Sequence, residues 1–286
     1  MKRSFADILQ GLDSDRAQKV ARKLPAWAAV DGLEIPSALS LEQCSSSATA
    51  AYKASLAGQA VSTSGFAAAL PDPIEPCPIS TILDLTGGLG VDSFAFSQVA
   101  ERVVYFERNA ELAAAAGRNF ARLGAGNIEV RCEEVTPETE LPEADLIYAD
   151  PARRDAAGRK VFLLEDCTPD ILTLLPLLLR KAPAVLVKLS PMADLAMLAE
   201  RLGPALREIH VVECDGEVKE LLCLLLRDNP SPEPDIVVAR LTASRGGILV
   251  HEATGGHGFG GQHPTASLRS IIRRLNLLAH CYRFLA

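Results

Sequence analysis

The sequence lacks the cysteine spacing that metal centres and disulfide frameworks use. It contains seven cysteines, an odd number, and no two of them form a C-x-x-C pair. Zinc sites and disulfide-rich folds depend on such spacing, because their ligands or partners must converge in space. We therefore expect reduced, mostly buried thiols and no bound metal ion.

No apolar run in the sequence has the length of a membrane span. The longest, ILTLLPLLLR (171–180), is interrupted by a proline, whereas a spanning helix needs about 20 apolar residues. The N-terminal MKRSFADILQ has basic residues without the apolar stretch that follows them in a secretory signal. The sequence therefore predicts a cytoplasmic protein that does not enter a membrane.

Positive charge is also not in excess. The 29 lysines and arginines are outnumbered by 36 aspartates and glutamates, which gives a formal net charge of −7. This balance argues against a protein that coats nucleic acid non-specifically, because such binding neutralises many phosphates. It still allows a local basic surface, so RNA stays open as a partner.

What the sequence does contain is an alternation of short apolar runs with helical segments. From residue 79 onward, five strand–helix repeats precede two consecutive strand patterns, REIHVVEC and KELLCLLLR. Buried strands that alternate with helices predict an α/β fold with helices on both faces of a parallel sheet. The final strand pair predicts an antiparallel hairpin at the sheet edge.

Two proline-rich breaks, PDPIEPCP and NPSPEPD, suggest how the chain is divided. Before the first break the spacing is helical, without a convincing strand. We therefore predict a helical N-terminal domain over 1–75, an α/β domain over 76–228 and a C-terminal extension over 229–286.

The strongest motif is LDLTGGLG (83–90), between a predicted strand and a predicted helix. Gly87, Gly88 and Gly90 allow the backbone to approach a ligand closely. The helix that follows presents free N–H groups to that ligand. Glu107 ends the next strand, where a carboxylate can accept both ribose hydroxyls of an adenosine. The motif therefore predicts an adenosine-containing cofactor.

A nicotinamide dinucleotide is the alternative ligand. Its G-x-G-x-x-G fingerprint fails here, because Ser93 occupies the third glycine position. Asp84 is also unexpected beside a pyrophosphate, whereas an extra carboxylate suits the ammonium group of S-adenosylmethionine (SAM). The residues therefore favour SAM over NAD or another nucleotide. A glycine turn without a ligand is the remaining alternative.

ILDLTGGLGVDSFAF, VVYFERN and LIYADPAR resemble motif I, the ribose-binding acid and motif IV of class I SAM-dependent methyltransferases, over about residues 79–228. The resemblance implies a Rossmann-like sheet of seven strands with the last strand antiparallel. It also implies the cofactor-binding residues: Asp84, Thr86, Gly87, Gly88 and Gly90 for the methionine part, Glu107 with Arg108 for the ribose, and Glu133 or Glu134 for the adenine amine.

Further segments, LEQCSSSATAAYKASL and DPARR…GRKVFLLEDCTPD, are similar to a bacterial subgroup of these methyltransferases. The subgroup has a DPAR-type motif IV, and its members often carry a THUMP-like domain at the C-terminus. The residues after 235 are too few for a complete domain of that kind, so we expect a divergent or incomplete substrate-binding extension.

Motif IV is the candidate acceptor site. Amine-methylating members of the family have D/N-P-P-Y/F/W, and this chain has Asp150 and Pro151 followed by Ala152, Arg153 and Arg154. We expect the Asp150 carboxylate and the Pro151 carbonyl to accept the protons of an amine. Arg153 replaces the aromatic residue, and a guanidinium can stack on a base or pair with a phosphate.

Two alternatives stay open for the basic residues of this region. Arg153 and Arg154 can form a surface pair with nearby carboxylates, or they can bind substrate. Lys188 ends the fifth strand on the ligand side of the sheet, where it can contact an acidic substrate or remain solvated.

The leading hypothesis is a SAM-dependent methyltransferase that modifies a nucleobase nitrogen in rRNA or tRNA. A methyltransferase of small molecules or proteins is the second, which the acidic composition favours slightly. A non-catalytic SAM-binding scaffold is the third, which the altered motif IV permits.

Overall fold

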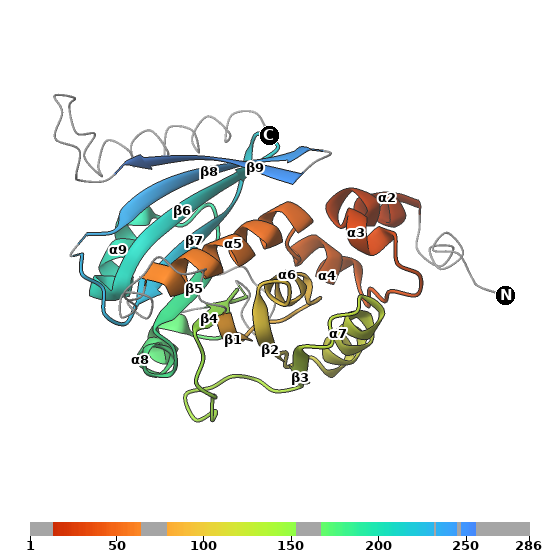
Figure 1. Cartoon of the computed structure of the whole chain (residues 1–286), viewed down its shortest axis with the longest axis horizontal. Coiled ribbons are helices and arrows are strands. Elements are labelled where there is room, and N and C mark those ends of the chain that lie inside the picture. The colour runs from red at the N-terminus through yellow and green to blue at the C-terminus, as the bar shows by residue number, and fades with distance from the viewer. Residues whose placement is uncertain (1–13, 64–78, 153–166, 232, 245–246, 256–286) are drawn as a thin grey trace, which may run out of the picture.

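The computed structural model describes residues 14–63, 79–152, 167–231, 233–244 and 247–255. A nine-stranded sheet runs through this part of the chain (Figure 1). In spatial order its strands are β3 (Ile128–Arg131), β2 (Ala100–Phe106), β1 (Ile79–Asp84), β4 (Leu146–Ala149), β5 (Ala184–Leu189), β7 (Glu217–Leu226), β6 (Leu206–Cys214), β8 (Asp235–Ser244) and β9 (Gly247–Gly255).

The predicted α/β fold class is confirmed. Strands β3, β2, β1, β4 and β5 run parallel, and β7 is antiparallel to both β5 and β6. The first seven strands in the spatial order thus give the arrangement that the resemblance implied. The sheet is wider than predicted, because β8 pairs in parallel with β6 and β9 pairs antiparallel with β8. Residues 235–244 and 247–255 therefore extend the same sheet beyond residue 228.

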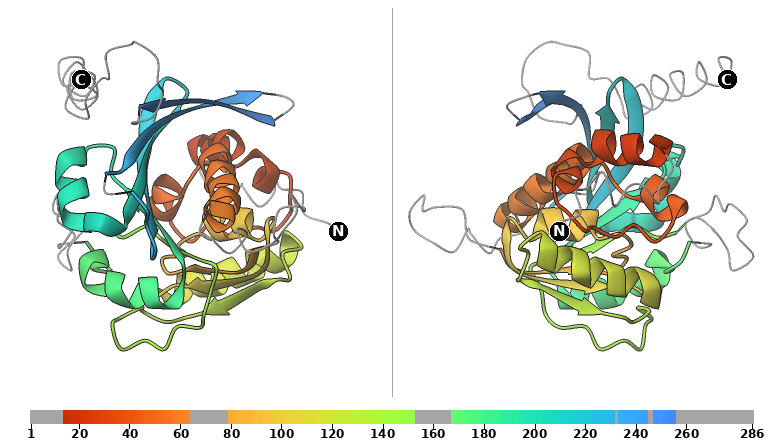
Figure 2. Two further views of the ribbon diagram at one scale, coloured as in Figure 1. Left: turned by 60° about the vertical axis from the view of Figure 1, so that its left-hand side comes forward. Right: turned by 90° about the vertical axis from the view of Figure 1, so that its right-hand side faces the viewer.

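Helices cover both faces of this sheet (Figure 2). On one face, α8 (Ile171–Lys181) and α9 (Leu195–Leu202) pack against strand residues such as Val185 and Val187. On the other face, α5 (Ser47–Thr63) packs against Leu186, and Phe96 of α6 (Val91–Phe96) contributes to the same apolar cluster. Alternate residues of one strand thus enter opposite cores, as expected for a strand buried on both sides.

A further helix, α7 (Ala110–Arg122), lies beside β2 and β3. Its Phe120 packs on Tyr105 of β2, and Val130 of β3 joins the same cluster. The helix begins where the Asn109 side chain accepts hydrogen bonds from two backbone N–H groups of the first turn.

The helical character predicted for the N-terminal region is confirmed for its described residues. These form α2 (Ser14–Lys23), α3 (Pro25–Ala28), α4 (Ala38–Gln43) and α5. Leu24, Trp27 and Leu41 share an apolar cluster with Leu89 and Val91, at the start of α6. The N-terminal helices therefore lie directly against the glycine-rich turn. The predicted boundary near residue 75 lies outside the described residues.

Among the described residues, no helix has the length and apolar character of a membrane span. In the same part of the chain, no group of three or more histidine, cysteine, aspartate or glutamate side chains is arranged to hold a metal ion. The described cysteines are free thiols, and three of them, Cys167, Cys214 and Cys223, are buried.

Candidate active site

The turn between β1 and α6 has a shape that requires glycine at two positions. A Cβ atom at Gly87 would lie 2.0 Å from the Tyr105 ring, and one at Gly90 would lie 2.5 Å from the Phe120 ring. Gly90 also has a φ of +88°. Tyr105 and Phe120 pack edge to face, and the Tyr105 hydroxyl donates to the Gly88 carbonyl at 2.6 Å. The aromatic pair therefore fixes the course of the turn.

Glu107 follows β2 and reaches this turn. Its Oε2 accepts a hydrogen bond from the Gly88 N–H at 2.9 Å, and its Oε1 accepts one from the Asn109 N–H at 2.7 Å. Each carboxylate oxygen has a further lone pair, so both can still accept from a ligand. Among the described residues, a Cβ atom at Gly88 would meet only the Thr86 carbonyl oxygen, at 3.8 Å, so none of their side chains covers this side of the turn. Open backbone beside a fixed carboxylate fits a ligand with vicinal hydroxyls.

Asp84 lies at the end of β1 and is almost completely buried. Its carboxylate accepts hydrogen bonds from the Thr86 N–H at 3.1 Å and from the Ser93 hydroxyl at 2.5 Å. Burial raises the pKa of Asp84 to about 7, although the Ser93 hydrogen bond opposes the shift. A cationic group bound nearby would stabilise the ionised form of this carboxyl.

Asp150 follows β4 and is joined to the glycine-rich turn. Its backbone N–H donates to the Thr86 hydroxyl at 2.6 Å, and its Oδ2 accepts from the Lys188 ammonium at 2.5 Å. The Asp150 side chain is one-third exposed, and that of Lys188 is 14% exposed. Burial alone would lower the pKa of Lys188, but the charges of Asp150, Glu220 and Asp92 raise it above its ordinary value. Lys188 therefore stays protonated at neutral pH, and its ammonium group holds the Asp150 carboxylate.

The predicted adenine-binding residues follow β3. The Glu133 N–H donates to the Glu107 carbonyl at 3.1 Å, so the two glutamates are neighbours. Glu134 pairs with Arg108 at 3.0 Å, with both side chains about half exposed. Arg108, which was predicted to act at the ribose, thus contacts Glu134, a residue predicted to bind the adenine amine.

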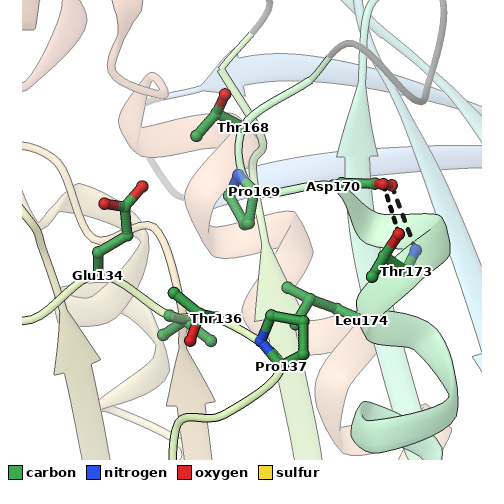
Figure 3. A pocket seen from close by; sticks show the side chains of 9 residues that line it. Glu134, Thr136, Pro137, Thr168, Pro169, Asp170, Thr173 and Leu174 are labelled. Atoms are coloured by element: carbon green, nitrogen blue, oxygen red, sulfur yellow. Dashed lines mark hydrogen bonds between the residues drawn. The ribbon is translucent and has the colours of Figure 1, made fainter.

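A pocket of about 180 Å³ opens beside Glu134. Figure 3 shows Glu134, Thr136 and Pro137 on one side and Thr168 and Pro169 on the other. The Asp170 carboxylate and the Thr173 hydroxyl, which also line it, hydrogen-bond to each other at 2.6 Å. The pocket therefore lies between the loop after β3 and the start of α8.

Nearly all the predicted site residues in the described part of the chain lie at the carboxyl ends of neighbouring strands. Residues 84–90 follow β1, 107–108 follow β2, 133–134 follow β3 and Asp150 with the buried Pro151 follows β4. Lys188 lies near the end of β5. Open α/β sheets bind ligands at this edge. Arg153 and Arg154 lie outside the described residues.

A group of buried polar side chains beside Lys188 was not predicted from the sequence. Lys53, Asp92 and Glu220 form ion pairs, and the Asp92 carboxylate also accepts from Ser45 and Tyr148. Lys53 lies in an alanine- and serine-rich helix, where a lysine is usually solvated. One sign of this buried group is present in the sequence: Glu220 interrupts the apolar pattern of the predicted strand 219–227.

Comparison with solved structures identifies the type of α/β fold. A protein from Porphyromonas gingivalis W83, provisionally described as a methyltransferase, is 31% identical with a TM-score of 0.65. The match covers 88% of this chain and 61% of that one, so this chain spans about three fifths of the length of its relative. The chain has the Rossmann-like fold of class I SAM-dependent methyltransferases.

Two other matches are weaker, one because it covers a short stretch of the chain and the other because its structural similarity is low. A protein-L-isoaspartate O-methyltransferase from Methanoregula boonei is 33% identical over 72 residues, which are 25% of this chain and 33% of that protein. A structure from Pyrococcus horikoshii, provisionally described as an RNA methyltransferase, is 17% identical with a TM-score of 0.43 and covers 64% of this chain and 80% of that one. No protein-family model matches the sequence.

Proposed function

We propose that this protein is a SAM-dependent methyltransferase that methylates a nucleobase nitrogen in RNA. The observation that carries the proposal is the position of Asp150. Through Thr86 it is hydrogen-bonded to the glycine-rich turn, and through its carboxylate it is paired with Lys188. The candidate acceptor-binding group is thus fixed next to the candidate cofactor-binding turn, as an in-line methyl transfer requires.

The described residues fit SAM as the cofactor. Glu107 has the free lone pairs to bind the two ribose hydroxyls, and the open side of Gly88 lets the ligand approach the backbone. The buried Asp84 carboxyl favours a cationic methionine portion. When bound, SAM supplies an electrophilic methyl group. We assign Glu133 or Glu134 to the adenine amine, with Arg108 orienting Glu134.

The Asp150–Lys188 pair offers the acceptor a carboxylate and an ammonium side by side. The carboxylate accepts hydrogen bonds, and the lysine, which stays protonated, only donates them. An exocyclic amine next to a ring nitrogen matches this pair, because the amine donates and the ring nitrogen accepts. Adenine and cytosine present such an edge. The Pro151 carbonyl is the second proposed acceptor of the amine protons.

The choice of RNA rests on the arginines of motif IV. Arg153 and Arg154 are three and four residues after Asp150 in the sequence and would contact base or phosphate. We also keep three further proposals: the narrower resemblance to the DPAR subgroup with a THUMP-like C-terminal domain, the cytoplasmic location, and the division at 1–75, 76–228 and 229–286. In this division the last segment adds β8 and β9 to the sheet of the second. RNA binding that weakens steeply with salt would support this substrate class.

Labelled SAM provides the test of the proposed reaction. The protein is incubated with total RNA, protein and metabolite fractions, and we expect label in RNA. Asp150→Ala should abolish the transfer and leave the SAM dissociation constant nearly unchanged, because Asp150 is assigned to the acceptor. Asp228→Ala, at an exposed position after β7, is the matched control and should retain full transfer. Transfer that survives Asp150→Ala would refute the assignment.

Methylation of a protein or small-molecule carboxylate is the second candidate function. Lys188 beside the acceptor position favours it, because an ammonium group would pair with an anionic acceptor. The stretch shared with a protein O-methyltransferase points in the same direction. Label in the protein or metabolite fraction, with none in RNA, would select this candidate. SAM binding with no labelled fraction would instead indicate a non-catalytic scaffold.

A further inference from the structure

A row of charged and polar side chains crosses one face of the sheet beneath α5. Lys188 of β5 pairs in register with Leu222 of β7, and Glu220 lies two residues further along β7. Side chains two residues apart point to the same face of a sheet, so Lys188 and Glu220 lie on one face. Leu186 of β5 and Tyr148 of the neighbouring strand β4 also point into the core beneath α5. The charges therefore occur in a largely apolar layer, in which the buried His210 of β6, hydrogen-bonded to Tyr52 of α5, is a further polar residue.

Lys53 of α5 reaches into this layer and is completely buried. Its ammonium group donates to Glu220 Oε1 at 2.7 Å and to the Ser45 hydroxyl at 2.9 Å, and it lies 3.2 Å from Asp92 Oδ1. Asp92 Oδ1 accepts no hydrogen bond from the described residues. The Lys53 charge is therefore the partner that balances two buried carboxylates.

The two lysines share three carboxylates. Lys188 is paired with Asp150, but the negative charges of Glu220 and Asp92 also act on it. Without the charge of Lys53, Glu220 and Asp92 would be buried anions without a cation, and such anions draw the nearest cation strongly. Among the described residues, Lys188 is the cation whose charge acts on Asp92 most strongly after that of Lys53, and its flexible four-carbon side chain can move.

We propose that Lys53 is a positioning residue for methyl transfer: by pairing with Glu220 and Asp92, it leaves Lys188 to Asp150. The inference rests on the proposed role of Asp150 at the acceptor. It explains why a lysine of the N-terminal helices is buried under the site. Those helices then complete the acceptor site as well as covering the sheet.

The direct test follows the lysine ammonium groups by NMR and does not depend on a known substrate. Lysine-labelled protein gives signals that Lys53→Arg and Lys188→Arg assign. In Lys53→Met we expect the Lys188 signal to shift and its protons to exchange faster, because the pair with Asp150 is weakened. In Lys53→Met/Glu220→Gln, which removes one competing anion, the Lys188 signal should return towards its native position. Lys19→Met, at a surface ion pair on α2, is the control and should leave it unchanged.

Transfer activity supplies a second readout once an acceptor is known. Lys53→Met should lower kcat by about tenfold or more and change the SAM dissociation constant by less than about threefold, because the cofactor contacts are intact. Lys53→Arg should recover part of kcat. An unchanged Lys188 signal in a folded Lys53→Met protein would overturn the proposal, whatever the substrate proves to be.

If Lys53→Met fails to fold, the same coupling is measured from the other end. Asp150→Asn, at a partly exposed position, releases Lys188 towards Glu220 and Asp92 and should shift the Lys53 signal, because coupling between two sites is reciprocal. A Lys53 signal identical to that of the native protein would also overturn the proposal. Loss of transfer in Asp150→Asn without that shift would leave the proposed function standing and reject only the role of Lys53.

Discussion

At the scale of single residues, the shape of the glycine-rich turn depends on the side chains packed against it more than on its own sequence. Glycine at position 87 is required by the Tyr105 ring, and glycine at position 90 by Phe120 together with a left-handed backbone. A glycine-rich motif alone predicts backbone freedom, but it does not say which side chain fills the space. The sequence therefore predicted the position of the turn, and the aromatic pair beneath it became visible only in the structure.

Asp84 gives a pH-dependent prediction at the same scale. Its pKa is raised to about 7 by burial, whereas an aspartate in the unfolded chain ionises near its ordinary value of about 3.9. Between these values the folded protein binds more protons than the unfolded chain. The free energy of unfolding should therefore fall as the pH rises from about 4 through 7.

Asp84→Asn removes this loss, because the amide stays neutral. Relative to the native protein, its free energy of unfolding should gain on the order of 2 kcal/mol between pH 5 and pH 8. Urea unfolding at the two pH values measures the difference. Asp228→Asn, at an exposed carboxylate, is the control and should show no such gain. Parallel pH profiles for Asp84→Asn and the native protein would disprove the raised pKa.

At the scale of elements, the N-terminal helices are tied to the sheet by a few specific contacts. Asn119 of α7 is completely buried. Its Oδ1 accepts from the Glu34 N–H and its Nδ2 donates to the Glu34 carbonyl, each at 2.8 Å. The Glu34 carboxylate pairs with Arg118 and Arg122, and the Arg118 hydrogen bond lowers the pKa of Glu34 to about 2. One residue thus joins the loop before α4 to α7 through both backbone and side chain.

Asn119→Ala should therefore cost roughly 2 kcal/mol in the free energy of unfolding, because it removes two hydrogen bonds and leaves both backbone groups of Glu34 without their partners. Glu34→Gln is the matched comparison. It weakens ion pairs that are more than one-third exposed and should cost less than about 1 kcal/mol. Thermal or urea unfolding measures both. A larger loss from Glu34→Gln would show that the charged pairs, not the buried amide, hold the loop.

The elements themselves were largely predictable from the sequence. Alternating apolar strands and helices gave the parallel sheet, and the carboxyl ends of neighbouring strands brought Glu107 to the turn. Lys53 was not predictable, because its depth depends on how α5 lies across β5 and β7. Tyr148 could not be assigned either, since a tyrosine in an apolar strand gives no sign that its hydroxyl meets Asp92.

At the scale of the whole molecule, the extent of the sheet differs from the sequence prediction. NPSPEPD has the composition of a linker, and it suggested that the α/β domain ends at residue 228. Composition does not show where the chain goes after a turn, and here it returns to pair with β6. Ile236 joins the core beneath α8 and α9, whereas Ala239 and Leu241 join the core beneath α5. Strand β8 therefore contributes to both cores.

A chain that ends at Asp228 tests whether this strand is part of the folding unit. Removing β8 would expose the edge of β6 and the apolar residues that β8 covers on both faces, and it would remove the 2.6 Å ion pair between Arg207 and Asp235. We expect the shortened chain to lose cooperative urea unfolding and SAM binding, because exposed edges and apolar surface favour association over folding.

Ile236→Ala in the full chain should cost roughly 2–4 kcal/mol in the free energy of unfolding, as for other buried isoleucines. A shortened chain that unfolds cooperatively at the native midpoint would instead establish 229–286 as a separate domain.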